Sequence, residues 1–330
     1  MRFRPVRPGV GRLSLALLAV VPAALAFPWR SPTDHALLAI GIAAVVLLLG
    51  SWNGLHVTTI VRRRCALVRG RRTAVSSGDS GAVDATATAV LRINSAIASS
   101  FPLPLLVDYL DRYGIRADAI RITNRSSASG ATQTWIGITI SAAANLVALT
   151  ARSADLPLNE TTQVAARRLA DHLRELGWEA ALAGDDELPE LLTRVGRESW
   201  TAVERDDTDY CAAYRIGIAD AQSALQAARS LPAVETWTAL ELSPGAGRGP
   251  EPGLTAAMAC AVRVADMSAL SSLTEEFVPE RGNHWSALQA LELVSGRRLN
   301  GPVTLNPETL AELSWPVAAS AADHQQVLAG

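Results

Sequence analysis

Two long apolar segments dominate the first sixty residues of the chain. They cover residues 13–29 (LSLALLAVVPAALAFPW) and residues 36–55 (ALLAIGIAAVVLLLGSWNGL). A membrane-spanning helix needs about 20 apolar residues, with about 17 as the short limit. The second segment meets that length, and the first, which contains Pro22, is marginal. The pattern predicts two helices that form a transmembrane hairpin.

The arginines around these segments predict the orientation of the hairpin. Only Arg30 lies between the two segments, with Asp34 beside it. The flanks carry the remaining arginines of this region: Arg2, Arg4, Arg7, Arg12, Arg62, Arg63, Arg64, Arg69, Arg71 and Arg72. Because positively charged flanks stay on the cytoplasmic side, we expect a multi-pass protein of the bacterial inner membrane with both termini in the cytoplasm.

A signal peptide is the alternative for the first segment. It has a basic start, a short apolar core and Ala24-Leu25-Ala26, which resembles a cleavage site. Cleavage stays open at this point. It would leave the second helix, its arginine-rich flank and the position of the following domain unchanged.

Small residues in the second segment allow close approach of partner helices, although placement against lipid stays open. Trp52 stands where interfacial aromatic residues are expected. The expected docking positions on this segment and just after it are Gly41, Ala44, Gly50, Trp52, Gly54 and Thr58.

Residues 73–86 are small and polar and predict a linker, and residues 87–330 predict a folded cytoplasmic domain. In residues 134–140 three isoleucines alternate with Trp135, Gly137 and Thr139, a period of two that predicts a strand with one buried face. The expected strands are 88–93, 119–123, 134–140, 178–182, 199–204, 212–218, 236–242 and 257–264. The expected helices are 104–113, 159–176, 187–194, 219–229 and 284–294. Hairpins mixed with helices indicate an α+β, or mixed α/β, domain, and no internal repeat is recognisable.

Charge divides the chain in the same place. Residues 1–72 carry 11 arginines and one acid, and residues 73–330 carry 19 arginines and 31 acids. The basic cluster that follows the second segment is expected to touch anionic lipid headgroups. Nucleic acid is not expected as a partner, because the large domain is acidic. The chain has no lysine, which excludes Schiff-base chemistry and the phosphate-loop lysine.

Few residues suggest catalysis or metal binding. Asp207 and Asp209 form an Asp-x-Asp pair, which could hold a divalent cation as in many glycosyltransferases, but aspartates between two strands are also favoured turn residues. The glycine-rich loop 245–249 precedes prolines and a strand, not the helix of a phosphate site. The three cysteines form no C-x-x-C pair. We expect no cofactor, no resident metal and no catalytic residue.

Several stretches together resemble one family. They are Trp52–Thr59 (WNGLHVTT) running into Arg62–Arg64, Trp135–Thr139 (WIGIT), Val164–Ala170 (VAARRLA) and Leu176–Trp178 (LGW). With the two preceding helices, their order resembles the EccE component of mycobacterial type VII (ESX) secretion systems. The length resembles a short form, such as that of the system tied to iron and zinc acquisition.

The resemblance implies a structural, non-ATPase subunit of the inner membrane that assembles with EccB, the ATPase EccC and EccD. Such a subunit would stabilise a protein-translocation complex and would not be an enzyme. A membrane-tethered glycosyltransferase-like enzyme, active or degenerate, is the alternative, and it depends on Asp207 and Asp209.

Overall fold

The structure is a computed structural model of the 330-residue chain. It describes residues 10–25, 27, 31–49, 51–52, 55–69, 85–96, 101–192, 196–205, 209–245, 253–272 and 277–316. The chain divides into two compact units, Met1–Arg71 and Arg72–Gly330.

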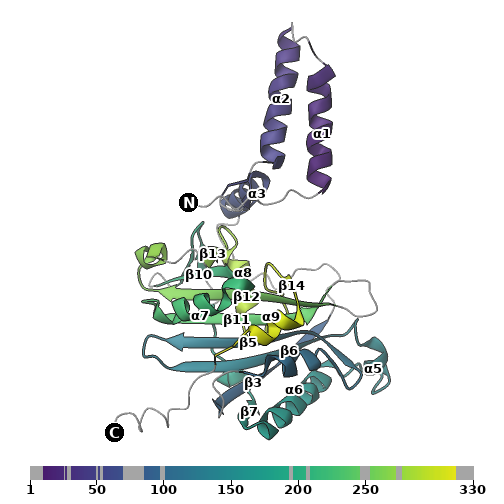
Figure 1. Ribbon diagram of the computed structural model, residues 1–330, viewed down its shortest axis with the longest axis vertical. Helices are drawn as coiled ribbons and strands as arrows, with labels where there is room; N and C mark the ends of the chain where they lie inside the picture. Colours follow the sequence, from purple (N-terminus) through teal and green to yellow (C-terminus); the bar gives the residue numbers. More distant parts are fainter. Residues whose placement is uncertain are drawn as a thin grey trace. The chain divides into compact units, whose positions relative to one another are not determined.

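The first unit is built from two helices, a short ladder and a third helix (Figure 1). The helices α1 and α2 pack side by side. The bounds are α1 Val10–Leu25, α2 Pro32–Leu49, β1 Ser51–Trp52, β2 Leu55–His56 and α3 Val57–Arg69. Among the described residues, the structure has no helix with the length and apolar character that crossing a membrane requires.

The second helix begins and ends earlier than its apolar pattern predicts. The N–H of Asp34 donates to the Ser31 hydroxyl at 3.2 Å, and the N–H of Ser31 donates to the Asp34 carboxylate at 3.0 Å. This reciprocal capping, with Pro32 in the first helical position, starts the helix at residue 32. After Leu49 the chain pairs Trp52 with Leu55. The Asn-Gly pair between them in the sequence is favoured in two-residue hairpins.

The second unit is a single antiparallel sheet with helices, so the expectation of a mixed α/β domain is confirmed. Its main path runs β7-β3-β6-β5-β11-β12-β10-β9-β8, and β13, β14 and β4 pair beside it. Every strand pair is antiparallel.

Most of the sheet is formed by two copies of one topology. In the first copy the chain order is β3-α4-β5-β6-α6-β7, and the strands lie in the order β7-β3-β6-β5. This is the split β-α-β arrangement known as ferredoxin-like. The bounds are β3 Thr86–Ala96, α4 Leu103–Asp108, β5 Ile115–Ser127, β6 Thr132–Ser141, α6 Leu158–Glu175 and β7 Trp178–Leu182.

The second copy repeats this order with a short 3₁₀ helix, η3, in the place of the last α-helix. The strands β13, β10, β12 and β11 are neighbours in that order. The bounds are β10 Asp209–Ile216, α7 Ala221–Ser230, β11 Glu235–Pro244, β12 Leu254–Val264, η3 Met267–Ser272 and β13 Phe277–Pro279. This duplication of topology was not recognisable in the sequence, where no internal repeat is seen. The two copies share the order and pairing of their strands but not a recognisable residue pattern, so the sequence alone does not reveal the repeat.

The two copies join edge to edge through β5 and β11. Their ladder runs from Ile120 opposite Leu242 to Ser127 opposite Glu235. We call this ladder the seam. Because β5 and β11 are the second strands of their copies, two edges that would otherwise be open satisfy each other's backbone groups.

Both faces of the sheet are covered. Helices α4, α6 and α7 pack on one face, together with α9 Pro307–Glu312, and α8 His284–Leu291 packs on the other. In β6 the predicted one-sided burial is wrong, since Trp135 is buried on the α8 side and Ile136 on the opposite side. The remaining elements are β4 Asp111–Arg112, α5 Leu146–Thr150, η1 Asp185–Glu187, β8 Gly196–Glu198, β9 Val203–Arg205, η2 Ile218–Asp220 and β14 Val303–Leu305.

Other differences from the expected helices have local causes. The helix expected over 104–113 ends at Asp108, and Tyr113 and Gly114 adopt positive φ angles of 57° and 70°. The helix expected over 159–176 is confirmed as α6, and Gly177, with a φ of 85°, ends it. The helix expected over 187–194 is not found in its described part, because residues 185–187 form a 3₁₀ turn and residues 188–192 are not helical, whereas residues 193 and 194 lie outside the described residues.

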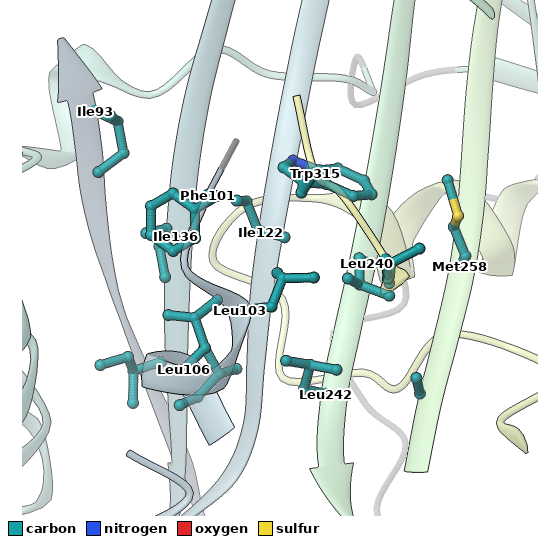
Figure 2. Packing of buried hydrophobic residues seen from close by; sticks show 14 of the residues in the cluster. Ile93, Phe101, Leu103, Leu106, Ile122, Ile136, Leu240, Leu242, Met258 and Trp315 are labelled. Atoms are coloured by element: carbon teal, nitrogen blue, oxygen red, sulfur yellow. The ribbon is translucent and has the colours of Figure 1, made fainter. Parts of the chain in front are cut away.

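The C-terminal segment covers the seam on the face of α4 and α9. Figure 2 shows the Trp315 ring lying between the strands that carry Ile122 and Leu240. Trp315 is fully buried, its carbonyl accepts the N–H of Phe101 at 3.0 Å, and the Asn124 side chain donates to the Pro316 carbonyl at 2.7 Å. Residues far apart in the chain therefore hold the two copies together.

Candidate functional site

The hairpin formed by α1 and α2 presents apolar side chains to its surroundings. Among its described residues only Ala16 and Gly41 are buried, and both are small. The large apolar residues that are more than half exposed are Leu15, Leu17, Leu18, Leu25, Phe27, Ile40, Ile42 and Val46. So much contiguous apolar surface is unusual for a water-facing element and marks an interaction surface.

The expected docking positions fall at different places in this unit. Gly41 is buried in α2, Ala44 is half-buried on the same helix, and Thr58 is half-buried in the first turn of α3. Trp52 belongs to β1, whereas Gly50 and Gly54 lie outside the described residues. Their role in docking stays a proposal.

The basic cluster is carried by a helix that the sequence analysis did not predict. Arg62 and Arg64 are exposed on α3, and Arg63 is half-buried. Arg69 is the last residue of this helix, and Arg71 and Arg72 lie outside the described residues. A basic, amphipathic helix directly after an apolar hairpin is typical of a segment that lies at a membrane surface.

Asp209 is held by arginines. Its carboxylate oxygens lie 3.4 Å from Arg263 Nε and 3.9 Å from Arg205 Nε. Arg263 also contacts Glu235 at 3.2 Å, and Glu235 pairs with Arg125, so the charges alternate across neighbouring strands. Two guanidinium groups already neutralise Asp209 and would repel a divalent cation.

The metal hypothesis therefore finds no support at Asp209, and Asp207 lies outside the described residues. Across the described part of the chain, no cluster of three or more His, Cys, Asp or Glu side chains could hold a metal ion. The two buried cysteines are also poorly suited to act as nucleophiles or metal ligands, because their thiols stay protonated. Burial raises the pKa of the Cys211 thiol to about 12 and raises the pKa of Cys260 further.

A buried ion pair crosses the seam on the face of α8. Arg121 Nη2 and Glu241 Oε2 are 2.6 Å apart, and the two side chains are 7% and 3% exposed. Arg121 also donates to the carbonyls of Ala290 and Arg297, each at 2.6 Å. The N–H of Leu299 donates to the Glu241 carboxylate. The pair thus ties both copies to the segment that follows α8.

A shallow hollow lies between the start of β5 and the first half of α6, and the empty space around its lining, open solvent included, is about 400 Å³. We call it the arginine pocket, because Arg112, Arg152 and Arg168 line it. Tyr109 and Tyr113 line it too. The Arg112 guanidinium lies 4.8 Å from the Tyr109 ring centre and 5.1 Å from that of Tyr113, and Arg168 lies 4.8 Å from the Tyr113 ring.

The pocket is ordered by contacts beneath its surface. The Tyr109 hydroxyl donates to the Arg168 carbonyl at 3.0 Å, and Arg152 donates to the Thr161 hydroxyl at 3.2 Å. Burial is the main cause that raises the pKa of Tyr109, so its phenol stays protonated. The sequence analysis missed this site because its residues come from four separate segments. The cluster Tyr109, Arg112 and Tyr113 was the available signal.

Comparison with known proteins places the chain in a family. Residues 128–216 match the family described as "Putative type VII ESX secretion system translocon, EccE". The chain is 48% identical over 321 residues to "ESX-3 secretion system protein EccE3" of Mycobacterium tuberculosis (strain CDC 1551 / Oshkosh), covering 96% of this chain and 95% of that protein. It is 44% identical over 292 residues to the EccE3 protein of Mycolicibacterium smegmatis, covering 88% and 90%.

The chain therefore belongs to the EccE family, as the resemblance implied. Its relatives carry the ESX-3 name, which agrees with the expected short form. It is a component of a type VII ESX secretion system, and the family is a structural component of that system and not an enzyme family. The glycosyltransferase-like alternative is wrong on this ground.

Proposed function

We propose that the chain is a structural, non-ATPase subunit of the inner-membrane ESX complex, assembling with EccB, EccC and EccD and stabilising the translocation machinery. The hairpin of α1 and α2 is embedded in the membrane, α3 lies at the cytoplasmic headgroups, and the second unit is cytoplasmic. The observation that carries the proposal is the exposed apolar surface of the hairpin, followed directly by basic α3.

Both helices are shorter than the full hydrocarbon core, so the proposed placement requires an adjustment of the bilayer or of its neighbours. At 1.5 Å per residue, α1 and α2 are about 24 and 27 Å long, against a hydrocarbon core of about 30 Å. Local thinning of the bilayer or packing against partner helices accommodates a shortfall of this size. The small residues Gly41 and Ala44 support close packing of a partner helix.

Purification tests the assembly. A tag on the C-terminus of the full chain, followed by extraction in mild detergent, should recover EccB, EccC and EccD. Replacing Ile40 and Ile42 of the hairpin by Arg should abolish this recovery, because charges do not enter the membrane without a large cost. The matched control places two arginines at Ser223 and Gln226, which are exposed on α7. Recovery of the unaltered chain alone, under conditions that keep the complex intact, would contradict the proposal.

Topology has its own test. Cys65 is exposed on α3, so a membrane-impermeant maleimide should label it in inverted membrane vesicles and spare it in intact spheroplasts. Labelling in spheroplasts would place α3 outside and reverse the proposed orientation.

A further inference from the structure

We propose that the arginine pocket binds an acidic segment of a partner protein, one that also carries an apolar side chain. The inference deepens the proposed function, because it depends on the chain working within a multi-protein complex. It names a contact surface on the second unit that is separate from the hairpin.

Charge is the first argument. Arg112, Arg152 and Arg168 have no carboxylate partner within the described part of the chain, and no acidic residue lines the pocket. Two of the nearby acids pair with other arginines, since Asp111 pairs with Arg116 and Asp171 pairs with Arg174. An acidic domain that leaves three guanidinium groups around one hollow offers a site for external negative charge.

The geometry of the arginines favours carboxylates. The guanidinium groups of Arg112 and Arg168 lie over the tyrosine rings, and neither side chain donates a hydrogen bond to another residue of the described part of the chain. A guanidinium fixed in this way binds a carboxylate through two parallel hydrogen bonds and loses little conformational freedom. Two arginines that contact the same Tyr113 ring suit two acidic side chains on one segment.

The apolar surroundings favour a protein segment over a small anion. Val164 is the exposed apolar residue of the lining, at 36%, whereas Ile115 and Ile138 form its buried floor. Helix α5, which ends two residues before Arg152 of the pocket, carries two exposed apolar side chains. Val147 is 85% exposed and Leu146 is 50% exposed. Asn145, the residue before α5, accepts the N–H of Arg116 at 2.8 Å and so holds α5 near the start of β5. A phosphate ion would leave this apolar surface uncovered, whereas an amphipathic acidic peptide covers it.

The pocket is an elaboration of one copy only. In the second copy the connection from α7 to β11 is Leu-Pro-Ala-Val, residues 231–234. In the first copy the corresponding connection holds both tyrosines and Arg112, and Tyr113 adopts a φ of 57°. A tyrosine in this left-handed conformation is strained, and such strain is retained most often where a side chain must be presented to a ligand.

Site-specific photocrosslinking tests the inference in the full chain, produced in the native host. Benzoylphenylalanine replaces Val164 at the edge of the pocket, and the control chain carries it at Gln226 on α7. Irradiation should join the Val164 position, and not the control position, to a peptide of another protein with at least two Asp or Glu residues close together. Crosslinks only to lipid, only to this chain, or to a peptide without acidic residues would overturn the inference.

Two neighbouring arginines provide matched variants. Arg168 lines the pocket, whereas Arg167, next to it on α6, contacts Gln163 instead. Arg168→Glu should lower the crosslinked product at least about tenfold, Arg168→Gln by less, and Arg167→Glu should leave it unchanged. Changing the acidic residues of the crosslinked peptide to arginine should restore the product with Arg168→Glu. Equal losses for R167E and R168E, or no restoration, would contradict a specific charge contact.

Two further results separate this inference from its alternatives. Calorimetry of the full chain with inorganic phosphate should show no binding that depends on Arg168, since tight binding of phosphate would identify a small-anion site instead. Recovery of the other ESX subunits through the tag should persist in R168E, because the hairpin carries assembly. If the unaltered chain recovers the other ESX subunits but gives no crosslink at Val164, the pocket inference is overturned and the proposed function stands. If the unaltered chain does not recover the other subunits, the proposed function itself is overturned.

Discussion

Arg121 and Glu241 lie directly opposite each other on β5 and β11, 120 residues apart in the chain, and form a buried ion pair. Each residue belongs to a different copy of the repeated topology. The guanidinium also donates to the carbonyls of Ala290 and Arg297, so one side chain joins both copies to the end of α8 and to the segment after it. A buried charge is tolerated only where its partners are all in place, and the seam supplies them.

Removing the negative partner should destabilise the chain strongly. Glu241→Gln keeps the shape of the side chain but leaves the Arg121 charge buried and uncompensated, which costs about 3–5 kcal/mol. Denaturant unfolding of the full chain, followed by far-UV circular dichroism, measures the change.

The exposed pair of Arg92 and Glu187 is the control. These side chains are 41% and 49% exposed and 3.5 Å apart. Glu187→Gln should change the free energy of unfolding by at most about 1 kcal/mol. Equal effects at Glu187 and Glu241 would show that the seam pair has no special structural role.

Trp315 should contribute to the seam through its volume alone. Its Nε1 is buried and has no hydrogen-bond partner within the part of the chain that the structure describes. Trp315→Ala should therefore cost about 3–5 kcal/mol, as large deletions in a core do, and Trp315→Phe should cost distinctly less because a ring still fills the site. Thermal unfolding of both variants shows which of them is less stable. An equal loss of stability in Trp315→Phe and Trp315→Ala would mean that a polar contact of the indole contributes.

The three cysteines should differ sharply in reactivity. Cys65 is exposed, while Cys211 and Cys260 are buried with raised thiol pKa values. Since the thiolate is the reactive species, iodoacetamide should modify one cysteine of the native chain at neutral pH and all three after denaturation. Intact-mass spectrometry counts the adducts. Rapid modification of Cys211 in the native chain would show that the sheet opens on that side.

Glu292 should make stability depend on pH. Burial is the main cause that raises its pKa above the ordinary value of 4.5, although its carboxylate accepts the N–H groups of Leu192 and Leu191 at 2.7 and 3.3 Å. The folded state then binds more protons than the unfolded state between the two pKa values, so the stabilising contribution is complete below the ordinary pKa and is lost as pH rises through the raised one.

Unfolding free energies of the unaltered chain and of Glu292→Gln, measured from about pH 4 to pH 8, test this dependence. The decline with rising pH should be smaller in the variant, which cannot ionise at this position. Glu187→Gln is the matched control and should keep the decline. An unchanged slope in Glu292→Gln would assign the dependence to other groups.

Local pattern determined much of this protein. The apolar runs predicted two neighbouring N-terminal helices, the alternation of residues 134–140 predicted β6, and the stripe on residues 159–176 with its terminal glycine predicted α6. Spacing of this kind reports which side of one element is buried. The combination of short stretches also identified the family, which 44–48% identity over most of the chain confirms.

Tertiary structure alone decided how these elements combine. The duplicated topology, the pair of Arg121 and Glu241, and the arginine pocket all join residues from separate segments. No periodicity within one element encodes such a contact, because it depends on strand order and register. Tertiary packing also buried β6 on both faces, since Leu293, from the segment after α8, lies against Gly137 on the side that alternation assigned to water.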